Sequence, residues 1–239
     1  MNEQNWQCRT ELLLGREQTE KLSKAHVMIA GLGGVGGYAA EQICRAGIGK
    51  LTLIDADTVQ PSNRNRQLIA TKLNEQKPKV HEWKMRLKAI NPEVELILIE
   101  EFIEADRIKE ILSSKPDYLV DAIDTLTPKV DLLATAHGMD IPTISAMGAG
   151  GRIDPSQIFI ADIKKSHHCK FAYIVRKYLH RKGVREGIKV VYSTEEVPKH
   201  ALIETDGSGN KRTVVGTISY LPAIFGCFCA SEVIRDLIK

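Results

Sequence analysis

The sequence lacks paired cysteines and a signal-like leader, and each absence excludes a class of protein. Its five cysteines (Cys8, Cys44, Cys169, Cys227 and Cys229) are odd in number and form no Cys-x-x-Cys pair. This pattern argues against a disulfide framework and against a four-cysteine zinc site, and it favours a reducing compartment. Because the N-terminus has neither the basic start nor the apolar run of a signal peptide, we expect a cytoplasmic protein.

The sequence also lacks a convincing membrane-length apolar run. Residues 213–231 carry no charge, but Gly216, Pro222 and Gly226 interrupt them, and several serines and threonines lower their hydropathy. A buried helix within 213–239 is therefore favoured over a span, and membrane association is the weaker alternative. With 239 residues, of which 43% are hydrophobic, the chain can bury one core, so we expect a single domain.

The modest net charge of +3 conceals a concentrated cationic segment. Between residues 163 and 189 there are nine basic residues and one acidic residue, Glu186, which leaves 24 basic and 29 acidic side chains elsewhere. The segment thus carries +8 and the rest of the chain −5, so a polyanion such as a nucleic acid is the expected partner. A solvated helix face is the alternative. The candidate phosphate contacts are Lys164, Lys165, Lys170, Arg176, Lys177, Arg181, Lys182 and Arg185.

Short apolar runs alternate along the chain with longer segments of helical periodicity. Strands are predicted at 26–30, 50–55, 94–100, 118–121 and 141–146, and helices at 35–46, 78–90, 105–113, 127–139 and 169–182. This alternation is typical of an α/β protein with a doubly wound, mostly parallel, Rossmann-like sheet. We divide the domain into a nucleotide-binding α/β core over 1–151, a basic region inserted or appended over 152–212, and a C-terminal helix over 213–239. Residues 204–212 are predicted as a polar loop.

Four glycines lie between the first predicted strand and its helix: Gly31, Gly33, Gly34 and Gly36. Glycine lets the chain turn tightly and lets a phosphate approach the backbone amides at the positive end of the helix. Asp55 follows Gly36 by nineteen residues, the spacing expected for a carboxylate that binds ribose hydroxyls. Together these features predict a nucleotide site, but they do not distinguish NAD from ATP.

A polar run at residues 63–67 separates these two possibilities. Arginine forks and a lysine point charge suit a polyphosphate, and this region offers Arg66 and, at the start of the next predicted helix, Lys79. Asn63 and Gln67 add neutral donors, and Asp57 belongs to the same candidate set. The run therefore favours a triphosphate over a dinucleotide, whereas a polar, solvent-exposed helix start is the alternative.

Two carboxylates follow the buried strand predicted at 118–121. The carboxyl ends of the strands face the ligand crevice in a doubly wound sheet, so Asp124 is a candidate Mg²⁺ ligand, directly or through water. Its alternative role is to cap the helix that begins before Pro128. Asp121 lies nearer the strand and is expected to cap or brace the loop.

These motifs resemble those of the ThiF/MoeB/HesA family, relatives of ubiquitin-activating enzymes that adenylate carboxylates. The resemblance covers nearly the whole chain. The matching stretches are Gly-x-Gly-Gly-x-Gly at 31–36, Asp-x-Asp-x-Val-x-x-Ser-Asn-x-x-Arg-Gln at 55–67, the lysine at 79, and Asp-Ala-Ile-Asp at 121–124. Residues 45–49, 148–158 and 191–195 resemble the branch of the family that acts on threonylcarbamoyladenosine in tRNA.

The resemblance implies a role for each matching residue. Asp55 would bind the ribose of ATP, and Asp124 would place Mg²⁺. The residues that would hold the triphosphate are Asn63, Arg66, Gln67 and Lys79. Arg9 would reach across a homodimer to the neighbour's ATP, where it would stabilise charge at the reacting phosphorus.

The resemblance also implies a reaction, the ATP-dependent cyclisation of threonylcarbamoyladenosine in tRNA. The carboxylate attacks the α-phosphate, pyrophosphate leaves, and an internal nucleophile then closes a ring and expels AMP. Adenylation of the C-terminal glycine of a ubiquitin-like sulfur-carrier protein is the alternative, although the paired-cysteine zinc site of that branch is absent. An NAD-dependent dehydrogenase and a non-catalytic tRNA-binding protein are further alternatives. Cys169 lies among positive charges, but no general base for a cysteine nucleophile is identifiable.

Overall fold

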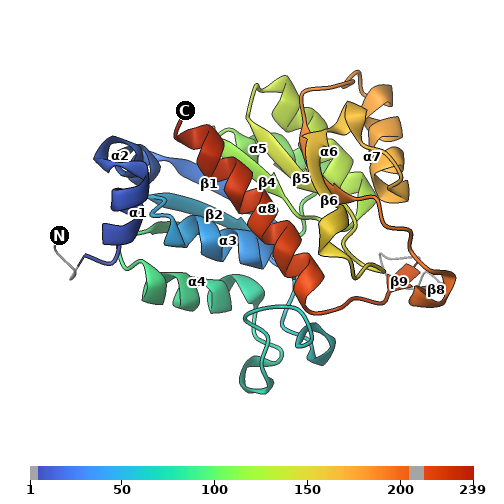
Figure 1. The fold of residues 1–239 in the computed structure, drawn as a ribbon, viewed down its shortest axis with the longest axis horizontal. Helices are drawn as coiled ribbons and strands as arrows, with labels where there is room; N and C mark the ends of the chain where they lie inside the picture. Colours follow the sequence, from blue (N-terminus) through green and yellow to red (C-terminus); the bar gives the residue numbers. More distant parts are fainter. Residues whose placement is uncertain (1–4, 205–212) are drawn as a thin grey trace.

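The computed structural model describes residues 5–204 and 213–239 and has a seven-stranded sheet at its centre (Figure 1). The strand order is β3-β2-β1-β4-β5-β7-β6, and every neighbouring pair is parallel except β6 and β7. The strands are β1 (His26–Ala30), β2 (Lys50–Ile54), β3 (Glu95–Ile99), β4 (Tyr118–Asp121), β5 (Thr143–Ala146), β6 (Ile158–Asp162) and β7 (Lys189–Ser193). The chain winds outward from β1 in one direction and from β4 in the other, which opens a crevice at the carboxyl ends of these two strands. The predicted doubly wound α/β fold is confirmed.

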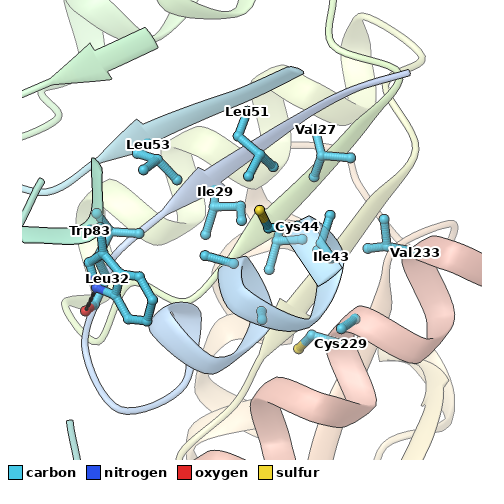
Figure 2. Close-up of a cluster of buried hydrophobic side chains, with 14 of the residues drawn as sticks. Val27, Ile29, Leu32, Ile43, Cys44, Leu51, Leu53, Trp83, Cys229 and Val233 are labelled. Atoms are coloured by element: carbon cyan, nitrogen blue, oxygen red, sulfur yellow. Dashed lines mark hydrogen bonds between the residues drawn. The ribbon is translucent and has the colours of Figure 1, made fainter. Parts of the chain in front are cut away.

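Helices cover both faces of this sheet. One face carries α3 (Gly36–Arg45), α4 (Lys79–Ile90) and α8 (Tyr220–Leu237), and the other carries α5 (Ala105–Leu112), α6 (Leu126–Gly138) and α7 (Lys170–Arg181). Figure 2 shows Val27 and Ile29 of β1 facing Ile43 of α3 and Val233 of α8, all completely buried. Alternate residues of β1 pack on the opposite face, where Met28 joins the α5 and α6 side chains. The two faces of the sheet thus hold separate apolar layers, as a parallel sheet requires.

Two helices at the start of the described chain were not predicted. They are α1 (Cys8–Leu14) and α2 (Arg16–Lys24), joined by Gly15, whose φ of 83° lies in the region that favours glycine. The Gln7 side chain donates a hydrogen bond to the carbonyl oxygen of Arg45 at the end of α3. Since the crevice lies at the beginning of α3, this contact places α1 at the opposite end of the sheet (Figure 1).

The predicted core elements are all present, with bounds that differ by two residues at most. The region predicted at 152–212 is different, because its first part supplies β6 and β7 to the main sheet and α7 to one face. The basic residues are therefore not set apart in an insertion. The remaining short elements are the 3₁₀ helices Pro61–Asn63, Lys72–Asn74, Pro155–Gln157, Ile163–Lys165 and Lys199–Ala201, and the hairpin of β8 (Leu202–Glu204) and β9 (Thr213–Val215).

The C-terminal helix predicted over 213–239 begins later than expected, at Tyr220, because β9 occupies its first residues. Its buried side chains pack on α3 and the sheet, including Leu221 and Phe225. No helix in 5–204 or 213–239 has the length and apolar character that crossing a membrane requires. Most of the predicted polar loop, from residue 205 onward, lies outside the described residues.

Candidate active site

The glycine turn between β1 and α3 leaves no room for larger residues. Gly31 has a φ of 87°, and a Cβ atom there would lie 2.8 Å from the carbonyl oxygen of Ala122. At Gly36 a Cβ atom would lie 1.8 Å from the carbonyl oxygen of Gly31. The turn is therefore pressed against the end of β4, and its free backbone amides lie at the start of α3, where an anion is stabilised.

Asp55 ties the end of β2 to this turn. Its carboxylate accepts one hydrogen bond from the backbone N–H of Leu32 at 2.6 Å and another from that of Asp57 at 2.8 Å. Only 8% of the side chain is exposed, and burial raises the pKa of Asp55. A carboxylate can accept about four hydrogen bonds, so roughly two remain for the hydroxyl groups of a ligand.

Lys79 is the first residue of α4 and lies beside the two aspartates. Its Nζ is 2.7 Å from a carboxylate oxygen of Asp57 and 3.8 Å from one of Asp55, and the side chain is only 5% exposed. Its backbone N–H donates to the carbonyl oxygen of Asp57 at 3.0 Å. Asp57 itself is 73% exposed. A buried cation is thus held at the edge of the crevice by a carboxylate that is free to move away.

The polar run at 63–67 folds over the glycine turn. The side-chain oxygen of Asn63 accepts the N–H of Gln60 at 3.0 Å, and its carbonyl oxygen accepts the N–H groups of Arg66 and Gln67 at 3.1 and 2.9 Å. Asn63 therefore shapes the turn that presents the next two side chains. A Cβ atom at Gly34 would lie 3.3 Å from Cγ of Arg66, so the arginine packs directly on the turn.

Gln67 provides a buried polar atom without a partner. The side chain is buried, and its Oε1 is buried and accepts no hydrogen bond in the structure. Its Nε2 would lie 3.6 Å from a Cβ atom at Gly33, so the amide faces the glycine turn. Leaving a buried amide oxygen unpaired is costly, and a bound polar ligand would remove that cost. Rotation of the amide exchanges oxygen and nitrogen, so this position can offer an acceptor or a donor.

Arg66 and Asp124 lie close enough for their charges to interact. Burial lowers the pKa of Arg66, and the negative charge of Asp124 opposes this shift. Asp124 is exposed, and its carboxylate accepts a hydrogen bond from the hydroxyl of Thr125 at 3.4 Å. Thr125 is the N-cap of α6, so the alternative role of Asp124 as that cap is wrong. A positive and a negative side chain thus lie near each other beside the glycine turn.

A buried ion pair fixes the loop that carries Asp124. Nζ of Lys129 lies 2.6 Å from a carboxylate oxygen of Asp121, and neither side chain has any exposed surface. Lys129 also donates to the carbonyl oxygen of Ile123 at 2.8 Å, while Asp121 accepts the N–H of Ile123 at 3.0 Å. The hydroxyl of Ser145 donates to Asp121 as well. Both backbone groups of the residue before Asp124 are therefore held, which confirms Asp121 as the brace.

Sequence reasoning missed Lys129 and Trp83. The indole N–H of Trp83 donates to the carbonyl oxygen of Leu32 at 3.3 Å (Figure 2), and its ring closes the space over Gly37. Lys129 had a weak signal, a single lysine on a largely apolar helical segment. Trp83 had none beyond its helical position.

Two residues singled out from the sequence lie away from the crevice. Arg9 is exposed on α1, near the C-terminal end of α3, so the chain does not bring it to its own site. Cys169 is buried among apolar side chains of α6, α7 and β7, and its sulfur accepts a hydrogen bond from the buried Arg152 at 3.5 Å. This environment is that of a packing cysteine rather than an accessible nucleophile.

The basic residues of the 163–189 segment divide into two groups. Arg176 donates to the carbonyl oxygens of Ile163 and Ser166, while Lys164 pairs with Glu186 and Lys182 with Asp131, so these three side chains hold parts of the fold together. Lys189 belongs with them, because it pairs with Glu232 and Asp236. The second group is exposed and forms no ion pair with a described residue: Lys165, Lys170, Lys177, Arg181 and Arg185. Within the described part of the chain, no three His, Cys, Asp or Glu side chains gather in a way that could hold a metal ion.

Comparison with known proteins supplies the context for this geometry. The model of the ThiF family matches residues 7–239. The tRNA threonylcarbamoyladenosine dehydratase of Bacillus subtilis is 34% identical and covers 97% of this chain and 94% of its own. The crystal structure of the Escherichia coli tRNA N6-threonylcarbamoyladenosine dehydratase, TcdA, in complex with ATP matches with a TM-score of 0.86 and 32% identity, over 96% of this chain and 92% of that one. The Escherichia coli sulfur carrier protein ThiS adenylyltransferase is 32% identical, but over only 56% of this chain and 54% of its own.

Proposed function

Because the chain belongs to the ThiF family, we propose that it is an ATP-dependent dehydratase that cyclises threonylcarbamoyladenosine in tRNA. The observation that carries this proposal is the similarity to a dehydratase over 97% of the chain, whereas the carrier-activating relative matches only 56% of it. The site supports it independently, since Asp55, Arg66, Gln67 and Lys79 gather around one glycine turn.

ATP fits the crevice by its donor and acceptor set. Asp55 keeps acceptor capacity for the ribose hydroxyls, the turn amides and the start of α3 favour phosphate, and Gln67 gains the partner it lacks. Arg66 provides a fork for the phosphate oxygens. Lys79 exchanges its contact with Asp57 for the phosphates, so the pair keeps the cation in place before the substrate arrives.

The reaction needs no nucleophile from the protein. The carboxylate of the threonylcarbamoyl group attacks the α-phosphorus, and the bond from that phosphorus to the bridging oxygen of pyrophosphate breaks. An atom of the same threonylcarbamoyl group then attacks the activated carbonyl carbon, and AMP leaves with one carboxylate oxygen. The net change is loss of water from the nucleoside. Positioning and charge stabilisation by Arg66 and Lys79 supply the catalysis.

Mg²⁺ fits this site only if the protein and the ATP phosphates both supply its ligands. Asp124 would supply one oxygen ligand, and phosphate oxygens and water the others, because the described residues hold no cluster of three ligating side chains. When bound, the ion neutralises phosphate charge. The ion pair of Lys129 and Asp121 keeps the Asp124 loop in position for this role.

The exposed basic residues of 163–189 that form no ion pair with a described residue are proposed to bind the phosphates of tRNA, and they are Lys165, Lys170, Lys177, Arg181 and Arg185. Arg9 is proposed to act on the ATP of a second copy in a homodimer, since it lies far from its own crevice. The basic region thus selects the substrate while the α/β core activates it.

One experiment tests the function directly. The protein is incubated with ATP, Mg²⁺ and tRNA that bears the open threonylcarbamoyladenosine, and the nucleosides are analysed by mass spectrometry. We expect the cyclic nucleoside, with one AMP and one pyrophosphate formed per ring. Unchanged nucleosides, together with carrier-dependent pyrophosphate exchange when a ubiquitin-like sulfur carrier is supplied, would replace this function by the alternative one.

A further inference from the structure

Four aromatic rings gather at the β6 edge of the sheet. The ring centroids of Phe159 and His167 are 6.5 Å apart, and each of these rings also lies against Tyr192, at 6.1 and 5.6 Å. His168 packs edge-on against His167 at 5.3 Å. The hydroxyl of Tyr192 lies 3.1 Å from Nδ1 of His167. A buried tyrosine therefore fixes the orientation of the rings above it.

Three of these rings are open to solvent. Phe159 is 45% exposed and both histidines are exposed, whereas Tyr192 is 2% exposed. Phe, Trp and Tyr make up only 5% of the sequence, yet at this place Phe159 and two histidine rings are exposed together. An ordered, exposed aromatic surface of this kind is typical of a binding site rather than of packing.

The surroundings of the rings are positively charged. Lys165 and Lys170 each lie two residues from the histidine pair in the chain, are exposed, and form no ion pair with any described residue. Further along α7, the guanidinium of Arg181 lies 4.9 Å from the ring of Tyr178, which is 41% exposed. Interleaved aromatic and cationic side chains suit a ligand that carries both flat rings and negative charge.

The rings also lie at the end of the sheet that carries the crevice, the end where the parallel strands finish. Ile158 pairs with Ser193, the last residue of β7, and Phe159 pairs with Tyr192. Phe159 is therefore one residue from the end of the sheet where the parallel strands finish. Asp124 follows β4 at this same end. Three strand spacings separate β6 from β4, which is about 14 Å. This distance is a few nucleotides of a single strand.

We propose that Phe159, His167 and His168 form a stacking platform for unpaired nucleobases of the RNA substrate, with Lys165 and Lys170 on the adjoining phosphates. This inference rests on the proposed function, because it assigns the part of the tRNA that the site receives. Unpaired bases stack on aromatic and histidine rings in single-stranded RNA recognition, whereas bases in a duplex are not available to do so. The platform thus selects a single-stranded loop over a helical stem.

The test measures the affinity of the full chain for two RNAs of equal length, a stem-loop with an unpaired loop and a fully paired duplex, at several salt concentrations. Phe159→Ala is expected to weaken stem-loop binding by about tenfold or more, as loss of one stacked base does, and to leave duplex binding unchanged. Phe159→Tyr, which keeps a ring, is expected to restore the affinity. The salt dependence of binding to Phe159→Ala stays that of the wild type, because stacking releases no counterions.

Lys165→Gln is expected to change the salt dependence of RNA binding, which Phe159→Ala leaves unchanged. Loss of one phosphate contact lowers the slope of log affinity against log salt by about 0.7 for single-stranded RNA. Phe102→Ala is the matched control, because Phe102 is 47% exposed and follows β3, at the opposite edge of the sheet. It is expected to bind both RNAs like the wild type, and thermal melts verify that each variant is folded.

Wild-type stem-loop affinity in Phe159→Ala, or an equal loss on the duplex, would overturn the platform. Catalysis separates this failure from a failure of the proposed function. If the wild type cyclises modified tRNA, the platform requires Phe159→Ala to raise KM for tRNA and not KM for ATP. A wild type that cyclises no tRNA and binds a carrier protein through this surface would overturn both.

Discussion

The candidate nucleotide crevice and the basic face, which consists of the exposed Lys165, Lys170, Lys177, Arg181 and Arg185, hold their charged side chains in opposite ways. In the crevice, Asp55, Asn63 and Lys79 are buried and held by hydrogen bonds before any ligand arrives. On the basic face, Lys165, Lys170 and Lys177 are exposed and are held by no ion pair within the described residues. A preorganised site suits charge stabilisation during a reaction, whereas mobile surface cations suit a salt-dependent grip on a polyanion.

The largest expected effect is on the free energy of unfolding, when the buried ion pair that supports the crevice is broken. Lys129→Met leaves Asp121 buried without its counterion, so we expect the free energy of unfolding to fall by about 3–5 kcal/mol in chemical denaturation. Adding Asp121→Asn to the same chain removes the unpaired charge and should recover part of the loss. Lys177→Met, an exposed lysine on α7, is the control and should change little. An unaffected Lys129→Met would show that the crevice is not built on this pair.

The next effect is on catalysis. Arg66→Ala removes a cation from the phosphate site, and we expect turnover of ATP and modified tRNA to fall by about 100- to 1,000-fold. The affinity for tRNA should stay at the wild-type value, because the basic face is intact. Arg64→Ala is the control, since Arg64 pairs with Glu75 and belongs to the same turn. A loss of tRNA affinity in Arg66→Ala would contradict the assignment of tRNA binding to the basic face alone.

A smaller effect concerns Lys189, a half-buried member of the basic segment that pairs with the C-terminal helix. It pairs with Glu232 at 2.7 Å and with Asp236 of α8. Burial alone would raise the pKa of Asp236, but hydrogen bonds from Lys189, Lys239 and Tyr118 lower it to about 2. A depressed carboxyl pKa contributes stability above the unfolded pKa near 3.9, and this contribution is lost as the pH falls towards 2.

Asp236→Asn should therefore cost about 2 kcal/mol of unfolding free energy at neutral pH. The difference between this variant and the wild type should shrink between about pH 4 and pH 2 in denaturation at a series of pH values. A constant difference over that interval would show that the carboxylate is not held by its three donors.

The smallest effect separates two neighbours on α7. Arg176→Gln loses hydrogen bonds to the Ser166 loop and should lower the unfolding free energy by about 1–2 kcal/mol. Lys177→Gln should leave stability within about 0.5 kcal/mol and weaken only the salt-dependent binding of tRNA. Equal stability of the two variants in denaturant would contradict the structural role given to Arg176.

The sequence predicted the crevice better than the basic face. Glycine spacing and the acidic residue after β2 have few physical interpretations, so β1 and its turn could be placed before the structure was known. β6 and β7 were missed because their short apolar runs, at 158–161 and 190–192, stand beside the basic residues that dominate the composition. Composition counts charges but does not show which of them, like Arg176 and Lys189, are already paired.

The partners of buried polar residues also required the structure. The side-chain oxygen of Asn63 caps a turn that is local in sequence, while its amide NH2 keeps the donor capacity that the sequence predicted for a phosphate. Lys129 and Ser145 meet Asp121 from an adjacent helix and strand, and no spacing rule connects them. Stacked rings from β6, β7 and the loop before α7 are likewise a product of strand pairing.

The central claim is that the crevice transfers adenylate to a carboxylate, and isotope transfer tests it most directly. Modified tRNA with oxygen-18 in both carboxylate oxygens is cyclised with unlabelled ATP, and the products are weighed by mass spectrometry. Adenylate transfer to the carboxylate predicts AMP that carries one oxygen-18 atom and pyrophosphate that carries none. Unlabelled AMP beside a cyclised nucleoside would contradict it.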